Sequence, residues 1–510
     1  MKSMDRRRFL LAATATAALP SLTSFARAAQ TTATLKLHTA ETGPRIPDNF
    51  IGLSYETNEL TNPTFFSIEN TGLIAQFRAL SPNGVLRIGG NTSDIGYWKP
   101  TPSTPAPKIQ VRNMGIGEPN SSLAYSITPE AIHNLRAFLD RTGWTCIYGI
   151  NLGTNTPGRA AEEATYVAKV LGFTHEHGKL EYFQLGNEPD LFKTHLRDPK
   201  TWSPELYMDE WLDEANAIRA AVPNARFGLP DTAGSPEWYA AIVTRLLTLS
   251  APPDVAALTH HYYIGGPPSN PQMTIDYILA PNPKVPQLAH DIRAAAARLS
   301  SGEHRNIPYR MTEGNTCYRG GKPGVSDTFA ASLWAADYFL DLATQGYAGV
   351  NLHGGTGQYV GASLGGNLPG DDLVLAAHGD PSKHPHPYYT PIAHIQNQEQ
   401  DDYVLEPVAY GMLFAGHFAG ATSFPIDFNP GPVNATAYAA LLPTGQRIVA
   451  VINKDAHQSL NIDLAGYRQG PTLYAASLDS THVTLAEPSG DHELSTLPPA
   501  TAVLLYAARP

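Results

Sequence analysis

The feature that most constrains the fold is a strand–loop–helix unit that recurs from about residue 50 onward. Alternating strands and helices favour a parallel sheet, and eight such units predict a (β/α)8 barrel, an α/β fold. A doubly wound open sheet is the alternative, but no glycine-rich phosphate-binding turn follows the first segment. The apolar, β-rich segments are residues 50–55, 85–88, 145–152, 182–185, 226–229, 255–261, 308–312 and 349–353. Stretches with helical periodicity lie between them, at 129–142, 160–171, 204–221, 237–249, 288–299 and 327–343.

The pattern changes near the last hundred residues, where helical periodicity stops and turn residues separate short β-rich segments. This predicts a C-terminal antiparallel β-sandwich domain. We expect a strand at residues 34–38 to join that sheet. The predicted regions are a signal segment (1–28), an N-terminal strand region (29–48), the barrel (49–398) and the β-sandwich (399–510).

Residues 1–28 have the features of an export signal. Arginines at positions 6–8 precede Phe9 and an apolar run over residues 10–20, and Ala26-Arg27-Ala28 provides a small-x-small cleavage site. The arginines followed by Phe-Leu resemble a twin-arginine signal. Because the apolar run is short, a membrane-spanning helix is not expected, with an uncleaved anchor as the alternative. We therefore expect a periplasmic or extracellular protein with no stable membrane anchor after signal removal.

Charge and cysteine content narrow the classes of partner. The formal net charge is −11, and the signal segment is itself positive, so the remaining chain is still more acidic. Nucleic acids and other polyanions are therefore poor partners. Cys146 and Cys317 are the only cysteines in the sequence, and two cysteines do not make a disulfide framework. Their spacing is not that of a metal-binding motif. We expect unpaired thiols, no metal and no organic cofactor.

Two carboxylates fall at the ends of predicted strands. Glu188 closes the string Gln184-Leu185-Gly186-Asn187-Glu188 after the fourth segment, and Glu313 follows the seventh. The active sites of (β/α)8 barrels lie at this end of the strands, so both carboxylates are expected at one rim. A retaining glycosidase needs such a pair about 5–5.5 Å apart, one protonated and one ionised. A single glutamate here could instead be a loop salt-bridge partner, but the two positions together favour catalysis.

Four strings carry a resemblance to a known family: Leu86-Arg87-Ile88-Gly89-Gly90-Asn91, Gln184-Leu185-Gly186-Asn187-Glu188-Pro189, His260-His261-Tyr262-Tyr263 and Glu313-Gly314-Asn315-Thr316-Cys317-Tyr318-Arg319-Gly320-Gly321. The chain resembles glycoside hydrolase family 79, which contains β-glucuronidases and heparanases. That family belongs to clan A, a large group of retaining (β/α)8-barrel glycosidases. The first two strings are shared across the clan, and the other two are more specific. The resemblance covers nearly the whole chain after the signal segment.

The resemblance implies a role for each matching residue. Glu188 would be the general acid/base and Glu313 the nucleophile. Arg87 would keep Glu313 ionised and Tyr262 would hydrogen-bond it, while Asn187 would bind the sugar 2-hydroxyl. Arg87 could instead form a rim salt bridge, and Tyr262 could be a packed aromatic residue.

The resemblance also implies a set of substrate-binding residues. Glu56 and Asn91 would bind hydroxyls of the non-reducing sugar, unless they only cap loops. A glucuronate carboxylate would be held by backbone N–H groups in the loop at Tyr318, Arg319 and Gly320, and by a tyrosine after the eighth strand, Tyr359. Arg319 departs from the small or neutral residue expected there. It would either add a cation for the carboxylate, narrow the pocket or face solvent.

These observations lead to one expectation and two alternatives. The acidic chain lacks the basic clusters of a heparan-cleaving cleft, so we expect an exo-acting retaining β-glucuronidase that binds a small or oligosaccharide glycoside. A β-glucosidase or a disaccharide-releasing, rutinosidase-like enzyme on the same scaffold is the first alternative. A non-catalytic secreted carbohydrate-binding protein is the second. The sequence does not fix the aglycone, the oligomeric state or the pH optimum.

Overall fold

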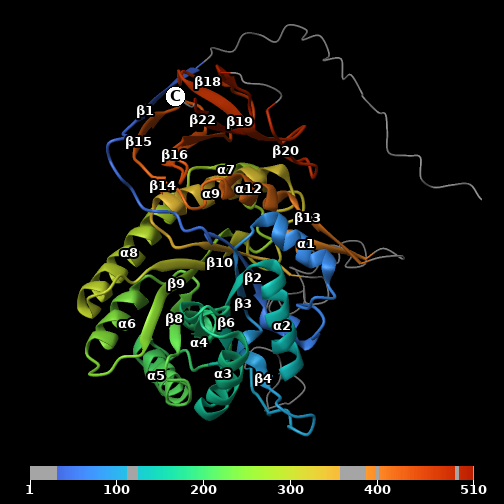
Figure 1. Cartoon of the computed structure of the whole chain (residues 1–510), viewed down its shortest axis with the longest axis vertical. Coiled ribbons are helices and arrows are strands. Elements are labelled where there is room, and N and C mark those ends of the chain that lie inside the picture. Colours follow the sequence, from blue (N-terminus) through green and yellow to red (C-terminus); the bar gives the residue numbers. More distant parts are fainter. Residues whose placement is uncertain (1–30, 112–123, 356–385, 397–400, 489–492, 509–510) are drawn as a thin grey trace, which may run out of the picture.

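Figure 1 shows a computed structural model of the chain, which describes residues 31–111, 124–355, 386–396, 401–488 and 493–508. The predicted signal segment and Tyr359 lie outside the described residues. Within the described ranges, no helix is both long enough and apolar enough to cross a membrane.

Eight parallel strands close into a barrel in the order β10-β11-β2-β3-β6-β7-β8-β9, which confirms the predicted fold. Each predicted segment overlaps one barrel strand. The strands are β2 (Ile51–Glu56), β3 (Val85–Gly89), β6 (Thr145–Ile150), β7 (Leu180–Leu185), β8 (Arg226–Thr232), β9 (Asp254–Gly265), β10 (Tyr309–Cys317) and β11 (Val350–His353).

Helices cover the outside of the barrel, as Figure 1 shows. They are α1 (Thr71–Leu80), α2 (Pro129–Thr142), α3 (Pro157–Leu171), α5 (Pro204–Ala221), α6 (Glu237–Leu247), α8 (Lys284–Glu303) and α9 (Phe329–Thr344), with the short α4 (Phe192–His195) and α7 (Ile275–Leu279) in the loops. Local sequence sets their ends. In α2, Thr128 accepts a hydrogen bond from the backbone N–H of Ala131, Pro129 occupies the first turn, and Gly143 ends the helix at φ 85°.

Strands β9 and β10 run several residues past their predicted ends. The extension stays buried along β10, so the chain keeps strand pairing beyond the barrel rim. The register of the pair shifts by one residue, because Met311 is paired with His260 whereas Glu313 is paired with His261. Thr312 is therefore the extra residue of a bulge, a feature that re-aims neighbouring side chains. The bulge lies directly beside Glu313.

The C-terminal region forms two sheets, and the N-terminal strand joins one of them, as predicted. A six-stranded sheet has the order β14-β16-β17-β22-β19-β20, and a four-stranded sheet has the order β15-β1-β18-β21. Strand β1 (Thr31–Leu37) pairs antiparallel with β15 and parallel with β18, the latter an exception to an otherwise antiparallel arrangement. The strands are β14 (Thr422–Ser423), β15 (Ile426–Asn429), β16 (Ala435–Leu441), β17 (Arg447–Asn453), β18 (Leu460–Ile462), β19 (Tyr467–Tyr474), β20 (Thr484–Ala486), β21 (Thr496–Leu497) and β22 (Thr501–Ala507).

The sheets rest on the barrel through α9 and α12 (Pro407–Gly416), which lie between them in Figure 1. A buried ion pair spans this contact: Lys454 Nζ lies 2.5 Å from Asp337 Oδ2 of α9. Thr436 and Tyr438 of β16 also donate hydrogen bonds to Asp337. A carboxylate with three donors satisfies the requirement that buried charge be paired. The exact boundaries of the four predicted regions remain predictions.

Two short strand pairs complete the described fold and lie outside the barrel and the large sheets. They are β4 (Gly96–Trp98) with β5 (Tyr125–Ile127), and β12 (Ile392–Gln396) with β13 (Asp401–Leu405).

Candidate active site

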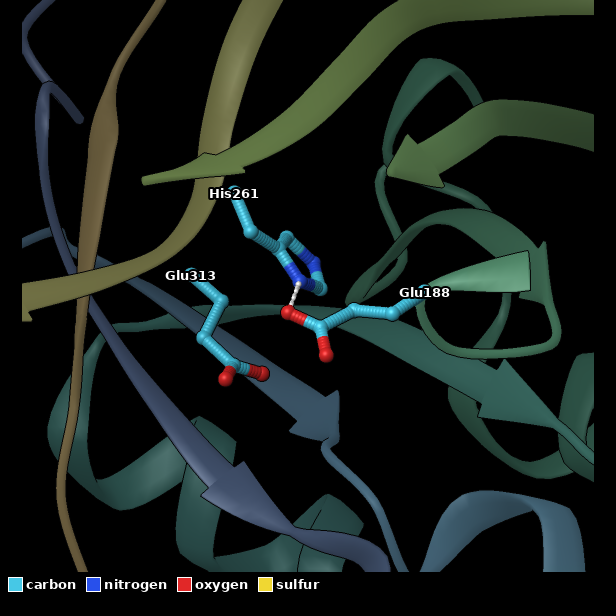
Figure 2. Close-up of side chains that lie close together, drawn as sticks. All are labelled: Glu188, His261 and Glu313. Atoms are coloured by element: carbon cyan, nitrogen blue, oxygen red, sulfur yellow. Dashed lines mark hydrogen bonds and ion pairs between the residues drawn. The ribbon is translucent and has the colours of Figure 1, made fainter. Parts of the chain in front are cut away.

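Glu188 and Glu313 face each other at the C-terminal end of the barrel strands. Glu188 follows β7, Glu313 lies in β10, and His261 lies between them on β9 (Figure 2). One side-chain atom of each residue lies within 4.8 Å of the others, so the two carboxylates approach to that distance. This agrees with the roughly 5–5.5 Å separation of a retaining pair. The predicted facing of these two side chains is confirmed.

Arg87 of β3 holds the floor of the site together. Its side chain is 1% exposed, and its Nη1 donates to Oε2 of Glu313 at 2.6 Å. Nη2 donates to Oδ1 of Asn187 at 2.8 Å and pairs with Oδ2 of Asp231 at 3.4 Å. Nε donates to Oε1 of Gln184 at 3.1 Å. The predicted contact between Arg87 and Glu313 is confirmed, and the buried guanidinium also contacts four further side chains, since Nη1 donates to the Ser54 hydroxyl at 3.2 Å as well.

The surroundings of Glu313 stabilise its carboxylate form. Burial alone raises the pKa of this group, but His353, His261 and Arg87 outweigh burial and lower the pKa to about 2. The hydroxyl of Tyr263 also donates to Oε1 of Glu313 at 2.9 Å. At neutral pH the Glu313 carboxylate is therefore ionised and able to act as a nucleophile.

The prediction that Tyr262 binds the nucleophile is wrong, because Tyr263 makes that contact. The Tyr262 hydroxyl is hydrogen-bonded to the Asn282 amide, and its ring stacks on Tyr338 with centroids 6.1 Å apart. Successive strand residues point to opposite faces, so Tyr263 shares its face with His261. The string His-His-Tyr-Tyr offers two adjacent tyrosines, and only the register of β9 decides which one enters the site.

Glu188 has the opposite electrostatic environment. Burial raises its pKa, and the nearby Glu313 carboxylate raises it further, whereas a hydrogen bond from His261 Nδ1 to Glu188 Oε1, 3.1 Å long, opposes the rise. The net shift is upward, which favours the protonated form. Its backbone is left-handed, at φ 49°, and its N–H donates to the carbonyl of Asp231 at 3.0 Å. Two carboxyls with opposite shifts are suited to acid and nucleophile roles.

The predicted sugar-binding residues Glu56 and Asn91 lie beside these groups. Glu56 ends β2 and is buried, and its Oε2 accepts hydrogen bonds from the N–H of Thr92 at 2.9 Å and from its hydroxyl at 2.6 Å. Asn91 Oδ1 accepts from the side-chain amide of Asn187 at 3.2 Å. The structure therefore brings Glu56, Asn91 and Asn187 to the rim. Their contacts with sugar hydroxyls stay predictions.

The loop predicted to hold a carboxylate has an unusual backbone. Arg319, Gly320 and Gly321 are consecutive left-handed residues, at φ 60°, 85° and 80°. The Gly321 N–H donates to the carbonyl of Cys317 at 3.0 Å, so it is not available to an anion. The ring of Tyr318 is partly exposed and meets Tyr263 edge-on, with centroids 6.3 Å apart. The loop is thus folded tightly against the site.

Tyr389 also lies beside this loop, although the sequence analysis did not assign it to binding of a glucuronate carboxylate. Tyr389 is buried, its hydroxyl meets the backbone N–H of Gly320, and it is hydrogen-bonded to Tyr263. Tyr359, to which this role was given, lies outside the described residues. Within the described part of the chain, Tyr389 is the tyrosine whose hydroxyl reaches Gly320, whereas the backbone N–H of Tyr388 donates to the Gly320 carbonyl at 2.7 Å.

Several other site residues escaped sequence reasoning. Asp231 and His353 lie at the ends of β8 and β11, and Asp94 accepts the backbone N–H of Asn187 at 2.9 Å. His353 Nδ1 lies 3.7 Å from Glu313 Oε2. Position at the C-terminal end of a barrel strand was the available signal for Asp231 and His353. No local pattern marks Asp94, which acts through a contact 93 residues away along the chain.

The atoms of Glu188, His261 and Glu313 are also of the types that bind cations. A cation would need His261 to be neutral. Burial lowers the pKa of His261, but the Glu313 and Asp231 carboxylates raise it to about 10, so the ring is an imidazolium. Arg87 already neutralises charge on Glu313. These charges favour acid–base chemistry at the cluster over metal binding.

The two cysteines are free thiols, and both are buried. Burial raises the pKa of both, that of Cys317 to about 12, so the reactive thiolate form is scarce. Cys317 lies close to the site in sequence and space, but its thiol has no nucleophilic role in this arrangement.

A parallel eight-stranded barrel with paired, oppositely tuned carboxylates at its C-terminal rim is the arrangement of retaining glycoside hydrolases. No protein-family model matches the chain. A β-glucuronidase of Aspergillus niger is 29% identical over 311 residues, covering 58% of this chain and 55% of that protein. A β-glucuronidase of Neurospora crassa is 26% identical over 361 residues, covering 62% and 59%. The chain spans a little over half the length of these curated relatives.

Solved structures show the same architecture. A 4-O-α-L-rhamnosyl-β-D-glucuronidase of Fusarium oxysporum superimposes with a TM-score of 0.62 at 16% identity, covering 93% of this chain and 99% of that one. At that identity the likeness concerns the fold. The chain is a homologue of glycoside hydrolases, and its resemblance to family 79 within clan A is confirmed by the curated relatives.

Replacement of Arg87 by methionine is expected to destabilise the protein in a pH-dependent way. Arg87 lowers the folded-state pKa of Glu313, so their pairing contributes stability above the ordinary pKa of a glutamate that is lost as pH falls toward 2. Without Arg87, the free energy of unfolding should drop by about 3–5 kcal/mol at about pH 7 and by clearly less at about pH 2.5, close to the folded-state pKa of Glu313. Urea unfolding at both pH values measures this.

Arg310→Met is the matched control. Arg310 is also a buried arginine, but its Nε donates to Asn351 Oδ1 at 2.8 Å and its Nη1 to the Ala348 carbonyl at 3.1 Å, and among the described residues it makes no hydrogen bond to a carboxylate. Its loss should cost a similar free energy at both pH values. An equal pH response in the two variants would contradict the charge-balance role of Arg87.

Proposed function

We propose that the chain is an exo-acting retaining β-glucuronidase that removes terminal β-linked glucuronic acid from small glycosides. The observation that carries the proposal is the pair Glu188 and Glu313, within 4.8 Å and with pKa values displaced in opposite directions. The curated relatives named as β-glucuronidases support the substrate class. A purely carbohydrate-binding protein would not need this division of charge.

The reaction follows from the two protonation states. In the first step, Glu188 donates its proton to the glycosidic oxygen while the Glu313 carboxylate attacks the anomeric carbon. The bond between that carbon and the glycosidic oxygen breaks, the aglycone leaves as an alcohol, and the sugar is esterified to Glu313. In the second step, Glu188 takes a proton from water, the water oxygen attacks the anomeric carbon, and Glu313 leaves. Two inversions give net retention.

Contacts around Glu313 serve both steps. The Tyr263 hydroxyl and Arg87 each bind one oxygen of the carboxylate, which fixes its plane toward the barrel mouth. Their hydrogen bonds also stabilise the carboxylate when it leaves in the second step.

Specificity for a carboxylate rests on the loop at Arg319 and Gly320. Backbone N–H groups of a turn can bind an anion without a formal charge, and those of Arg319 and Gly320 are the candidates here, because the Gly321 N–H donates to the Cys317 carbonyl. The Tyr389 hydroxyl, already at the Gly320 N–H, adds a second polar group there. The acidic sequence lacks the lysine and arginine clusters that would bind a long sulfated substrate, which supports exo action.

A neutral glycoside is the second candidate. One observation favours it: the Gly320 N–H is satisfied by Tyr389, so an incoming carboxylate must displace or share that contact. A β-glucosidase or a disaccharide-releasing enzyme would leave this contact in place.

Azide rescue tests the two catalytic roles. Glu188→Ala should lower kcat/KM for phenyl β-D-glucuronide by about 10²–10⁴-fold, because the phenolate then leaves without a proton. With a dinitrophenyl leaving group, added azide should restore turnover of Glu188→Ala and give the β-glycosyl azide. Glu313→Ala with azide should give the α-glycosyl azide. Proton NMR of the products distinguishes the anomers. Exchanged products would reverse the assignment, and an inverted sugar from the wild type would exclude the retaining mechanism.

A substrate panel tests specificity. Rates for 4-nitrophenyl β-D-glucuronide should exceed those for the glucoside and rutinoside by about 10²-fold or more, because the polar loop is left unpaired by a neutral sugar. The methyl ester of the glucuronide is the matched control, since it keeps the shape and removes the charge. Faster cleavage of the ester or the glucoside than of the acid would replace the glucuronidase proposal with the neutral candidate.

We also propose that the protein is exported, on the strength of the arginines and the apolar run within residues 1–28. Replacing Arg6 and Arg7 by lysine keeps the charge and should trap the protein in the cytoplasm of a host with twin-arginine transport. Cell fractionation followed by immunoblotting measures this. The same change at Lys36 and Arg45, to arginine and lysine, is the control and should leave export unchanged. Equal export of the twin-lysine variant would contradict this route.

A further inference from the structure

We propose that Asp231 and His261 form a positioning pair that orients the acid/base Glu188 and stabilises it when it becomes an anion. Neither residue attacks the substrate. Both act through Glu188. The inference rests on the proposed glycosidase function and extends it to residues to which no role was assigned by the sequence motifs.

Asp231 is connected to Glu188 by two routes. Along the backbone, its carbonyl accepts the Glu188 N–H at 3.0 Å. Through side chains, its Oδ1 lies 3.4 Å from His261 Nε2, and His261 Nδ1 lies 3.1 Å from Glu188 Oε1. Asp231 and Glu188 both hold left-handed backbones, at φ 57° and 49°, which for non-glycine residues costs free energy and persists at functional sites. One residue thus fixes both the main chain and the side chain of the acid/base.

His261 connects Asp231 to Glu188, and its surroundings favour the imidazolium form, in which both ring nitrogens carry a proton. The ring is fully buried, with a carboxylate oxygen facing each nitrogen. The 3.4 Å contact to Asp231 is long for a hydrogen bond and is an ion pair. The ring's own neighbour on the strand, His260, is neutral, because burial lowers its pKa to about 3. The charged or titratable groups near His261 are Glu188 and Asp190 after β7, Asp231 on β8, His260 and Tyr263 on β9 and Glu313 on β10, with Arg87 on β3 behind Asp231 and His353 on β11 behind Glu313.

His261 contacts one carboxyl oxygen of Glu188 and leaves the other oxygen available for catalysis. In Figure 2, His261 is bonded to one carboxyl oxygen of Glu188, and the other oxygen points away from the ring. That second oxygen can carry the proton to the glycosidic oxygen. After the transfer, Glu188 is a carboxylate that is only 14% exposed, a state that is costly without a partner. The imidazolium supplies that partner in place, without rearrangement.

Asp231 keeps His261 charged. A fully buried cationic ring near Arg87 would lose its proton without a counter-charge. Asp231 is itself held as an anion: burial raises its pKa, but His261, Arg87 and a hydrogen bond from Thr312 lower it overall. The Asp231 carboxylate therefore keeps His261 protonated, and the protonated His261 in turn stabilises the carboxylate form of Glu188.

The direction in which the pKa of Glu188 moves when Asp231 loses its charge distinguishes an effect through His261 from a direct electrostatic effect on Glu188. Removing the charge of Asp231 acts directly on Glu188 by making its carboxylate easier to form, which lowers the pKa of Glu188. Acting through His261, the same change lets the ring become neutral, and the pKa of Glu188 rises. The two routes predict opposite movements of the pH profile.

The experiment is the pH dependence of kcat/KM for phenyl β-D-glucuronide, whose poor leaving group needs the Glu188 proton. The fall in rate at high pH reports the pKa of Glu188 in the free enzyme. Asp231→Asn and His261→Gln should each move this alkaline limb to higher pH, by about one unit or more. The double variant should show no further upward movement, since both changes remove one interaction. The leaving group of 2,4-dinitrophenyl β-D-glucuronide needs no proton. With this substrate, the fall in kcat/KM at high pH should be small in the wild type and in every variant.

Asp94→Asn is the matched control. Asp94 is a buried aspartate that also holds the Asn187–Glu188 turn, through the Asn187 N–H, but the hydrogen bonds of its carboxylate within the described residues are to the backbone N–H groups of Leu152, Gly153 and Asn187 and not to the imidazole. It should lower the rate without moving the alkaline limb upward. Thermal melting of each variant verifies folding, and if Asp231→Asn does not fold, His261→Gln alone carries the test.

Each outcome is decisive. A limb that stays in place or moves to lower pH in folded Asp231→Asn or His261→Gln, with the wild type active, would overturn the positioning pair and leave the glycosidase proposal standing. A wild type that cleaves none of the phenyl or nitrophenyl glycosides would remove the proposed function itself. If the wild type cleaves only the glucoside, the same profiles measured with phenyl β-D-glucoside test the pair.

Discussion

The structure of the site depends on one buried charge, the guanidinium of Arg87. An arginine that is 1% exposed cannot remain without partners, because the loss of hydration must be offset by charge-assisted hydrogen bonds. Its partners come from β2, β7, β8 and β10 and from the turn after β7, so a single side chain couples five parts of the barrel. The positions of the Glu313 carboxylate, the Asn187 amide and the Asp231 carboxylate all follow from this requirement.

Barrel geometry then separates two chemically identical groups. Glu313 lies in a strand, where Arg87, His261, His353 and Tyr263 surround it with positive charge and donors. Glu188 lies on a left-handed turn, where burial dominates and the facing Glu313 is an anion. The pKa values diverge because the environments differ. The proposed acid and nucleophile roles therefore depend on the surroundings of each glutamate at the rim and not on the glutamate side chain itself.

The bulge at Thr312 and the alternation along β9 decide which side chains meet. A strand sends neighbours to opposite faces, so a shift of one residue exchanges every inward and outward group. On β9 this places His261 and Tyr263 toward the carboxylates and leaves His260 against Tyr347 and Tyr262 against Tyr338. The sheet domain, joined through the Lys454–Asp337 pair, covers the helices on one side of the barrel.

The sequence by itself determined the barrel and the positions of Glu188 and Glu313 at strand ends, because periodicity and strand ends are local properties of the chain. The contact of Arg87 with Glu313 was implied by the resemblance to family 79. It also indicated a first strand that joins the C-terminal sheets. Only the tertiary structure decided that Tyr263 rather than Tyr262 binds the nucleophile, and that Asp231, His353 and Asp94 belong to the site. Those assignments depend on strand register and on contacts between residues far apart in the chain. No local pattern encodes strand register, and a shift of one residue would exchange the side chains that face the site with those that face away. Contacts between distant residues are likewise not visible in any short stretch of sequence.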